Sequence, residues 1–493
     1  MGKKYIKFFW PKSKCPDIKF NTNMYEILFG MGHKHLSPST VIPILFRITP
    51  RKYKMAFHDD NFGEINYDEK IDLVAIGTLT GLADRAYEIA DGFKKRGVPV
   101  IMGGLHVTAL PEEALQHADS VVIGEVEGVW DQVLKDFSHH KLQKIYKSEE
   151  FFDLEKFKPV NYRMLNFNNY LTKTLQTSRG CPYSCEFCAV HKFFGHKIRC
   201  KTVKTSIQEL VNLFSNVPLY KESLMLSDDH FNGPRQHAIE FLKELEKLVI
   251  KIDKLKRSPL YLLKCFFVAL GFKFKIPLHT PLYVIQARVD IYKDDEMLDL
   301  LAKTGCFSII LGLESISQAS INQFGKKNNV EEYQTAIDKI QSKGIAVTGS
   351  FIVGTELDDI SVFRETAKFI MESKMLKPVI SIVTPFPGTN IYEQMKKDGR
   401  LLDKDYCYWD SNHVCFTPKN LTVQELQEGY YWMNQKIFDY NERMKVLKEV
   451  YLDWTKNGIN TQDPSLRTLI LQQNQELSWF AFSMPIIPDE KYI

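Results

Sequence analysis

Long hydrophobic runs are missing from this sequence of 493 residues. No stretch of about eighteen uninterrupted apolar residues occurs, so we expect no helix that spans a membrane. The N-terminal run MGKKYIKFFWPKSKC contains only a short apolar patch, broken by Lys7, which is too short for a secretory signal. Ile6 stands where a myristoylation motif that starts at Gly2 needs Ser or Thr. The sequence therefore predicts a cytoplasmic protein.

A strong charge of one sign is also missing. The formal net charge is only +4, so we expect no nucleic-acid partner. Hydrophobic residues make up 44% and charged residues 25% of the chain, which is ordinary for a globular protein of two or three domains. Three of the nine cysteines stand at metal-ligand spacing, which fits a reducing compartment better than a disulfide framework.

Those three cysteines, Cys181, Cys185 and Cys188, lie in the run RGCPYSCEFC with the spacing C-x3-C-x2-C. Three thiolates can hold three irons of a 4Fe-4S cube, and the fourth iron is then left without a protein ligand. Closed ferredoxin sites and structural zinc sites take four ligands. The next cysteine, Cys200, is twelve residues beyond Cys188. The spacing thus favours a cluster with one iron open to chemistry.

The residues around the triplet carry a family resemblance. Gly180 and Pro182 shape a tight loop, and Phe187 precedes the last cysteine. The segment resembles the cluster loop of the radical S-adenosylmethionine (radical SAM) superfamily. This resemblance implies that the amine and carboxylate of S-adenosylmethionine (SAM) chelate the open iron, and that Phe187 contacts SAM.

Short apolar strands alternate with helical patterns over residues 1–147, as in a doubly wound, Rossmann-like parallel sheet. We expect strands at 5–9, 53–57, 73–77, 99–102 and 120–123. Such sheets bind ligands at the carboxyl ends of their strands. Small or polar residues follow three of these ends: Thr78, Thr80, Gly103, Gly104, His106, Thr108, Gly124 and Glu125.

Two of these runs, GGLHVT and GEVEG, resemble the cobalamin-binding domain that precedes many radical SAM cores. The resemblance implies that the eight strand-end residues contact cobalamin, with His106 on the corrin side chains; a core or helix-capping histidine is the alternative. The run D-x-H-x-x-G, which supplies a lower axial histidine in one family of cobalamin domains, is missing. The nearest segment, HDDNFG at 58–63, does not match. We therefore expect no protein histidine on the lower face of the cobalt.

A polar, aromatic-rich linker at 148–172 leads to a second βα block at 173–390. Its six units are typical of a partial (βα)6 barrel with its function at the carboxyl ends of the strands. The cysteine triplet follows the first of these strands, where that rule places it. The predicted strands are 173–177, 224–226, 283–286, 308–313, 346–353 and 379–384.

Polar residues end several of these strands. Asp228 and Asp229 follow the second strand, where paired carboxylates can hold a metal, act as acid and base, or cap a helix. The family resemblance implies that both line the amine and ribose side of SAM. Arg288 is expected at the cofactor carboxylate or the substrate, and pairing with Asp290 is its alternative. The other residues that the resemblance assigns to SAM are Gln286, Glu314 and Gly349.

Basic and apolar residues are mixed in the segment 247–280, an apparent insertion in the barrel. This composition suits an interfacial helix on anionic lipid and hence a possible membrane association. A solvated basic helix followed by a segment packed on the barrel is the alternative. Residues 391–493 predict a helical extension whose aromatic side chains either close the barrel over an apolar substrate or belong to the core.

From end to end, the chain resembles the cobalamin-domain radical SAM enzymes, a group that includes hopanoid methylases and carbocycle-modifying enzymes. The resemblance implies an enzyme that cleaves SAM at a 4Fe-4S cluster and, with cobalamin, methylates an unactivated carbon of a small-molecule or lipid substrate. An external one-electron reductant such as flavodoxin or ferredoxin is then required. Radical-based cyclisation, ring contraction or another rearrangement is the first alternative. The second is a non-catalytic cobalamin or metal sensor whose cysteines bind zinc with His191 or His196.

Overall fold

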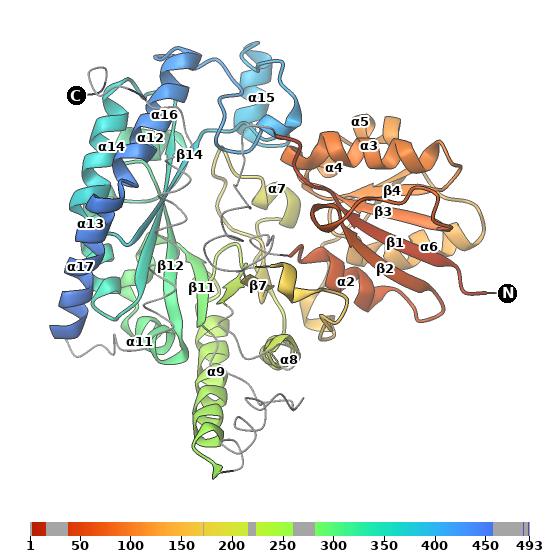
Figure 1. Ribbon diagram of the computed structural model, residues 1–493, viewed down its shortest axis with the longest axis horizontal. Coiled ribbons are helices and arrows are strands. Elements are labelled where there is room, and N and C mark those ends of the chain that lie inside the picture. Colours follow the sequence, from red (N-terminus) through yellow and green to blue (C-terminus); the bar gives the residue numbers. More distant parts are fainter. Residues whose placement is uncertain are drawn as a thin grey trace. The chain divides into compact units, whose positions relative to one another are not determined.

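The computed structural model in Figure 1 describes residues 2–15, 38–170, 172–214, 223–259, 282–456, 487 and 492. The chain forms two compact units. The first unit combines residues 1–174, 179–205 and 384–416, and the second combines 175–178, 206–383 and 417–493. The cysteine triplet and the segment after the last barrel strand therefore pack with the N-terminal sheet, whereas the predicted domains follow one another along the chain.

A six-stranded parallel sheet of order β2-β1-β3-β4-β5-β6 forms the centre of the first unit. The five predicted strands are confirmed within two residues. Strand β6 was not predicted, because three residues with a single buried side chain, Tyr146, give no alternating pattern. The strands are β1 (Tyr5–Trp10), β2 (Lys54–Asp59), β3 (Leu73–Gly77), β4 (Val100–Gly103), β5 (Ser120–Ile123) and β6 (Ile145–Lys147).

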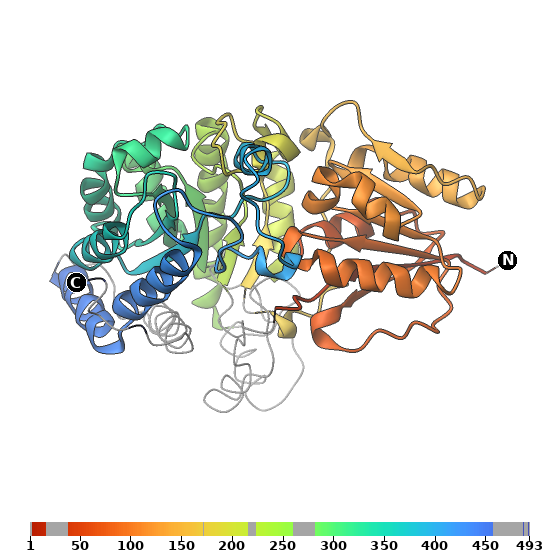
Figure 2. The ribbon, with the colours of Figure 1, turned by 90° about the horizontal axis from the view of Figure 1, so that it is seen from above.

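Helices cover both faces of this sheet (Figures 1 and 2). Helices α3 (Ala83–Lys94), α4 (Leu105–Ala109) and α5 (Pro111–His117) lie on one face, and α2 (Val41–Ile48) and α6 (Trp130–Ser138) lie on the other. Helix α3 buries one apolar face, which includes Ala86, Ile89, Ala90 and Phe93, in the core of the unit. The doubly wound α/β fold is thus confirmed.

The second unit contains a six-stranded sheet of order β14-β13-β12-β11-β10-β7. Neighbouring strands from β10 to β14 are parallel. The successive βα units confirm the predicted partial barrel. Its strands are β7 (Thr172–Leu175), β10 (Ser223–Leu226), β11 (Leu282–Ala287), β12 (Cys306–Glu314), β13 (Ala346–Val353) and β14 (Lys377–Ile382).

The helices that follow these strands lie along one side of the sheet, and two C-terminal helices extend the unit (Figure 2). Helix α16 begins at a capping box between Thr422 and Glu425. Its Gly429 makes room for the ring of Phe363, because an added Cβ would lie 2.3 Å from that ring. The helices are α8 (Val203–Phe214), α9 (Arg235–Lys256), α11 (Asp295–Thr304), α12 (Gln318–Gln323), α13 (Tyr333–Gln341), α14 (Ser361–Glu372), α16 (Val423–Ile437) and α17 (Tyr440–Lys456).

Aromatic side chains of the C-terminal extension belong to the cores of the two units. Tyr430, Trp432 and Trp454 are buried in the second unit, and Trp409 is buried in the first. The Trp454 Nε1 group donates a hydrogen bond to the Gln341 carbonyl oxygen at 2.6 Å. For these residues the geometry favours the core alternative over a cover for the substrate.

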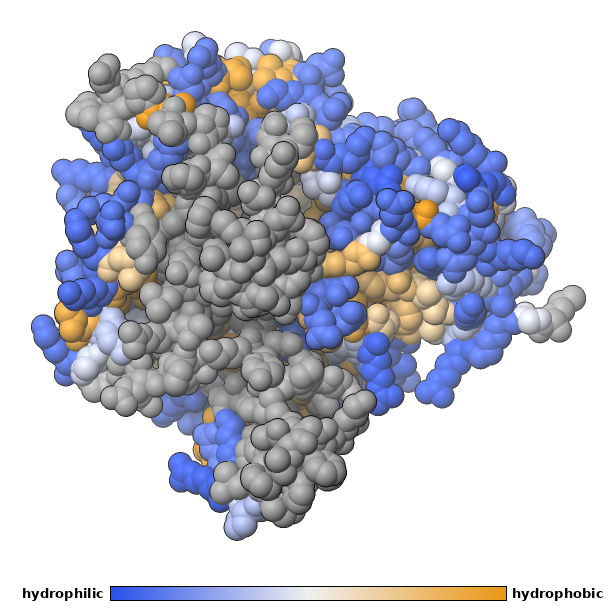
Figure 3. Space-filling view, viewed as in Figure 1, coloured by the Kyte–Doolittle hydropathy of each residue, from blue (hydrophilic) through white to orange (hydrophobic). Residues whose placement is uncertain are grey.

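The basic insertion is described only in part, since residues 260–281 lie outside the described residues. Its described part, 247–259, begins in the second half of α9, where Ile250 and Leu255 are 49% and 41% exposed. No helix in the described ranges combines the length and the apolar character that crossing a bilayer requires. On the face in Figure 3, hydrophilic side chains cover most of the described surface.

Candidate active site

The cysteine triplet lies between β8 (Ser178–Arg179) and α7 (Val190–Phe194). Cys185 is buried, Cys181 and Cys188 are half-buried, and none of the three forms a disulfide. The backbone N–H of Cys181 donates to the Gly195 carbonyl at 3.3 Å, and that of Cys188 donates to the Cys185 carbonyl at 3.0 Å. Hydrogen bonds therefore hold the backbone of the loop at both ends while the thiols stay unbridged.

Gly180 permits a close approach of two backbone segments at the start of this loop. It has a left-handed φ of +95°, and an added Cβ would lie only 2.5 Å from the Lys197 carbonyl oxygen. A residue with a side chain would be strained there and would push the segments apart. The loop thus forms a tight cradle, and its three thiols fit the ligand set of a cluster with one open iron.

The zinc alternative predicts that His191 or His196 lies next to the cysteine thiols. Within the described ranges, one group of three His, Cys, Asp or Glu side chains has its ligand atoms within 4.8 Å of one another, namely Cys15, Asp410 and His413. Neither His191 nor His196 forms such a group with cysteines of the triplet. This spacing disfavours a mononuclear zinc site at the triplet.

Two glutamates of the GEVEG run bind the arginine that precedes the loop. Arg179 forms ion pairs of 2.8 Å with both Glu125 Oε1 and Glu127 Oε1, and all three side chains are at most 5% exposed. Burial lowers the pKa of Arg179, but the charges of Glu127 and Glu125 outweigh burial and raise it. Glu125 also accepts a hydrogen bond of 2.8 Å from Arg199, which follows the loop. Glu125 therefore connects the N-terminal sheet to both flanks of the cysteine loop.

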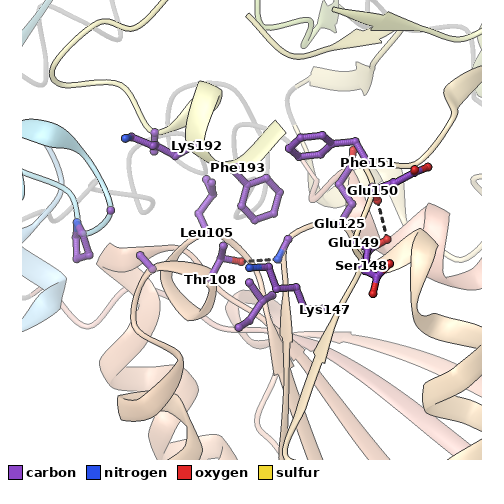
Figure 4. A pocket seen from close by; sticks show the side chains of 16 residues that line it. Leu105, Thr108, Glu125, Lys147, Ser148, Glu149, Glu150, Phe151, Lys192 and Phe193 are labelled. Atoms are coloured by element: carbon purple, nitrogen blue, oxygen red, sulfur yellow. Dashed lines mark hydrogen bonds between the residues drawn. The ribbon is translucent and has the colours of Figure 1, made fainter. Parts of the chain in front are cut away.

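A cavity of about 420 Å³ opens at the carboxyl edge of the same sheet. Figure 4 shows Leu105 and Thr108 from α4 on one side and Lys192 and Phe193 from α7 on the other. Because α7 follows Cys188 after a single residue, Ala189, one cavity is lined both by strand-end loops of the sheet and by the helix of the cysteine loop.

Three of the eight residues predicted to contact cobalamin line this cavity: Thr108, Gly124 and Glu125. The Gly124 N–H donates to Thr108 Oγ1 at 2.9 Å, which joins two neighbouring strand-end loops. Gly124 has a φ of +78°, and nothing lies within 4 Å of the place that a Cβ would occupy. The space beside the Gly124 Cα atom is therefore open.

His106 lies in the interior of the first unit. Its ring is fully buried, with Nε2 3.0 Å from the Tyr87 hydroxyl and Nδ1 3.4 Å from Thr80 Oγ1. Nε2 also lies 3.4 Å from Glu113 Oε1. Both ring nitrogens thus have partners in the protein, so this geometry favours the core-histidine alternative over the corrin contact.

The remaining predicted strand-end residues do not line the cavity. Thr78 and Thr80 are buried. An added Cβ at Gly104 would lie 2.3 Å from the Thr78 carbonyl oxygen, so this glycine serves the close packing of two loops. Thr78 takes part in this packing, Thr80 lies beside the His106 ring, and Gly103 ends β4 beside Val122.

In the second unit, Glu314 ends β12 with a left-handed φ of 64° and forms a buried ion pair with Lys326. Gly312 makes this pair possible, because an added Cβ would lie 2.5 Å from both Glu314 Oε1 and Lys326 Nζ. A buried carboxylate needs such a partner. Glu314 therefore lies at the strand end where the resemblance places it, and its charge is already compensated by a lysine.

Asp228, which was predicted to line SAM, has hydrogen-bond partners within the protein. Its carboxylate is fully buried and accepts hydrogen bonds from the Thr177 N–H at 2.6 Å, the Thr177 hydroxyl and the Ser178 hydroxyl at 2.9 Å. Burial raises the pKa of this group, and these hydrogen bonds oppose the rise. Asp228 thus fixes the chain at the end of β7, while the adjacent Asp229 is half-buried.

We expect Asp228→Asn and Asp229→Asn to separate stability from cofactor binding. Asp228→Asn places an amide against hydroxyl and N–H donors, so it should lower the free energy of unfolding by about 1–3 kcal/mol. Asp229→Asn should weaken SAM binding and lower the unfolding midpoint by less than Asp228→Asn does. Denaturant titration and equilibrium binding of SAM check both results. Equal stability losses in the two variants would contradict the assignment.

His230 is a residue that the sequence did not single out, although it directly follows Asp229. It is buried, and burial together with the charges of Arg288 and Lys326 lowers its pKa to about 4. The imidazole is therefore neutral at physiological pH. His230 therefore lies near the charged side chains of Arg288 and Lys326, which follow β11 and β12.

The other predicted SAM contacts have varied surroundings. Arg288 Nη2 donates to the Lys327 carbonyl at 3.1 Å and to Asn328 Oδ1 at 3.3 Å. The Gln286 carbonyl accepts from the Phe231 N–H at 3.1 Å. An added Cβ at Gly349 would lie 2.7 Å from Met375 Sδ, so core packing is sufficient to explain this glycine.

The sequence model of the radical SAM superfamily matches residues 175–370. This range contains the cysteine triplet and the polar strand ends of the second unit. The chain is a radical SAM enzyme. Its cofactors are accordingly a 4Fe-4S cluster and SAM.

Several relatives of this radical SAM enzyme are methyltransferases by name. Bacteriochlorophyllide d C-8(2)-methyltransferase of Chlorobaculum tepidum is 29% identical over 75% of this chain and 79% of its own length. The bacteriochlorophyllide d C-12(1)-methyltransferase of the same organism is 25% identical over 83% of this chain and 84% of its own length. Hopanoid C-2 methylase of Rhodopseudomonas palustris is 24% identical over 75% and 66%.

Solved structures share the fold of this radical SAM enzyme. The radical SAM methyltransferase TsrM from Kitasatospora setae, bound to cobalamin and a 4Fe-4S cluster, superimposes with a TM-score of 0.60 at 13% identity, over 97% of this chain and 100% of TsrM. The cobalamin-dependent radical SAM enzyme OxsB, with aqua-cobalamin bound, superimposes with a TM-score of 0.60 at 14% identity, over 97% of this chain and 80% of OxsB.

Proposed function

We propose that this radical SAM enzyme binds cobalamin in its first unit and methylates a carbon atom of a small-molecule or lipid substrate. The observation that carries the proposal is the cavity lined by both the strand-end loops and α7. When bound, the cluster and SAM supply radical chemistry and cobalamin supplies a methyl carrier. A ligand in this cavity would lie beside the helix that follows Cys188.

The topology of the sheet supports a ligand at this edge. In the order β2-β1-β3-β4-β5, chain connections run in opposite directions from β1, and such sheets bind ligands outside the carboxyl ends of their strands. The loops after β4 and β5 supply Leu105, Thr108 and Gly124 to the cavity wall. The open space at Gly124 admits a bulky ligand close to the backbone. A cavity of this size would enclose only part of a corrin ligand.

The chemistry of the lining residues agrees with the missing D-x-H-x-x-G run. No histidine is among the residues that line this cavity, and the nearest predicted candidate, His106, is held by Tyr87 and Thr80. The protein would thus offer the cobalt no imidazole. We expect bound cobalamin to have its nucleotide base displaced and no histidine ligand in its place.

Gly124→Val tests the cobalamin site, and Gly97→Val is its matched control. Both glycines have a positive φ, +78° and +74°, and both face open space, but only Gly124 lines the cavity. The two variants therefore carry similar backbone strain. We expect Gly124→Val to weaken hydroxocobalamin binding by tenfold or more, about 1.4 kcal/mol, and Gly97→Val to bind like the parent. Equal affinities for the two variants would contradict the site.

The reaction is tested with SAM that carries a label in its methyl group. The enzyme is reconstituted anaerobically with iron, sulfide and cobalamin and is incubated with a reductant and a cell lipid extract. We expect mass spectrometry to find the labelled methyl group on a product carbon. Release of 5′-deoxyadenosine with product that has lost hydrogen and gained no label would instead establish the rearrangement alternative.

A further inference from the structure

Three metal-ligating side chains meet in the first unit, apart from the cysteine triplet. Cys15 follows β1, whereas Asp410 and His413 follow the short helix η8 (Tyr406–Tyr408). One ligand atom of each lies within 4.8 Å of the other two. All three residues are half-buried or buried. Segments that lie almost 400 positions apart in the sequence thus bring a thiol, a carboxylate and an imidazole together.

Backbone hydrogen bonds orient two of these three side chains. Asp410 Oδ1 accepts from the N–H groups of Asn412 at 2.8 Å and His413 at 3.1 Å. The Asp410 carboxylate in turn lies 3.0 Å from His413 Nδ1. The ring of Tyr408 contacts the His413 ring edge-on, with centroids 5.1 Å apart. The carboxylate and the imidazole are therefore held in place, at 15% and 11% side-chain exposure.

The surroundings of the three residues are acidic. The Asp84 carboxylate accepts a hydrogen bond of 2.9 Å from the N–H of Cys407 in η8. Asp84, Asp405 and Asp410 all lie close enough to Cys407, which precedes Asp410 by three residues, to act on its thiol electrostatically. Of the nearby cations, Lys14 pairs with Glu88 at 2.5 Å and Lys404 lies over the Tyr408 ring at 5.7 Å. A bound cation would relieve this accumulation of negative charge.

We propose that Cys15, Asp410 and His413 bind a divalent ion of the zinc class. Thiolate, imidazole and carboxylate are the three ligand types that zinc takes in proteins, and softer or harder ions prefer more uniform sets. The protein supplies three ligands, and water completes the tetrahedron. The ion cross-links the chain after β1 to the loop after η8 and so stabilises the first unit. The site shares no ligand with the cysteine triplet.

Zinc content of the full-length protein tests the site. We expect about one equivalent of zinc per chain after exposure to zinc and desalting, measured by plasma mass spectrometry. Cys15→Ser and His413→Ala should each remove it. His117→Ala is the matched control, because His117 Nδ1 also lies 3.0 Å from an aspartate, Asp91, in the same unit but has no cysteine in a three-ligand group. The His117→Ala variant should still bind about one equivalent of zinc per chain.

Cobalt substitution adds a readout that a structural defect alone would not produce. In a variant with Cys181, Cys185 and Cys188 changed to alanine, which removes the iron–sulfur absorption, cobalt should show a thiolate charge-transfer band and tetrahedral ligand-field bands. Adding Cys15→Ser should abolish the charge-transfer band. No zinc in the parent protein would overturn the site and leave a metal-free His413–Asp410 pair. Zinc and cobalt signals that persist after Cys15→Ser would likewise overturn the proposed ligand set.

Discussion

Cys181→Ala, Cys185→Ala and Cys188→Ala are each expected to abolish reductive cleavage of SAM. Each change removes one of only three thiolate ligands, and a cube held by two thiolates has no stable place in the loop. Formation of 5′-deoxyadenosine by anaerobically reconstituted protein should therefore fall to background. Iron and sulfide per chain should fall in parallel, because the loss lies in the cluster and not in a later step.

Cys200→Ala is the matched control for this prediction. Cys200 is also half-buried, lies twelve residues beyond Cys188, and forms the short strand β9 (Arg199–Cys200) rather than part of the loop. We expect the Cys200→Ala variant to keep its cluster and to form 5′-deoxyadenosine like the parent protein. Activity that survives in any triplet variant, or reconstituted parent protein that holds zinc and no iron, would refute the cluster assignment.

Arg179→Ala is expected to lower both the stability of the first unit and its iron content. The change leaves the carboxylates of Glu125 and Glu127 buried at 2% and 3% exposure and with one partner fewer. Breaking one partner of a buried ion pair costs about 3–5 kcal/mol. Because Arg179 immediately precedes Gly180 and Cys181, the start of the loop loses its attachment to the sheet. Retention of iron should fall by about 10–100-fold, as for other residues that orient metal ligands.

The control for this prediction is Arg235→Ala. Arg235 also pairs with two carboxylates, Asp294 and Glu296, but its side chain is 55% exposed. Water screens such pairs, so the unfolding midpoint and the iron content should hardly change. Arg179→Lys should recover part of the stability by restoring the charge, yet not the fork that reaches both glutamates. Normal iron content in Arg179→Ala would contradict the proposed attachment.

Local patterns of the sequence were sufficient for the fold and for the cysteine loop. Buried strands appear in the sequence as short apolar runs between turn residues. For β3, β5 and β13 the predicted bounds are those of the structure. The ligand spacing of the triplet is a local property as well, because all three thiols lie within eight residues. Neither the apolar runs nor the thiol spacing depends on residues that are distant in the sequence.

Partners from distant segments decided which polar strand-end residues are buried within the protein. Asp228 and Asp229 are neighbours, yet only Asp228 is buried under Thr177 and Ser178. His106 and Thr108 belong to the same short helix, yet His106 turns to Tyr87 while Thr108 lines the cavity. A sequence pattern gives residue type and period, but burial and hydrogen-bond partners depend on what packs against each side chain.

The sequence by itself was thus sufficient for the radical SAM family, for the cluster spacing of the cysteine triplet and for the doubly wound N-terminal sheet. Only the tertiary structure decided that Glu125 binds Arg179 at the start of the cysteine loop, and that Cys15 meets His413. The physical reason is the range of the interactions. Strand periodicity and thiolate spacing act over a few residues, whereas buried ion pairs and ligand groups form between segments that only the folded chain brings together.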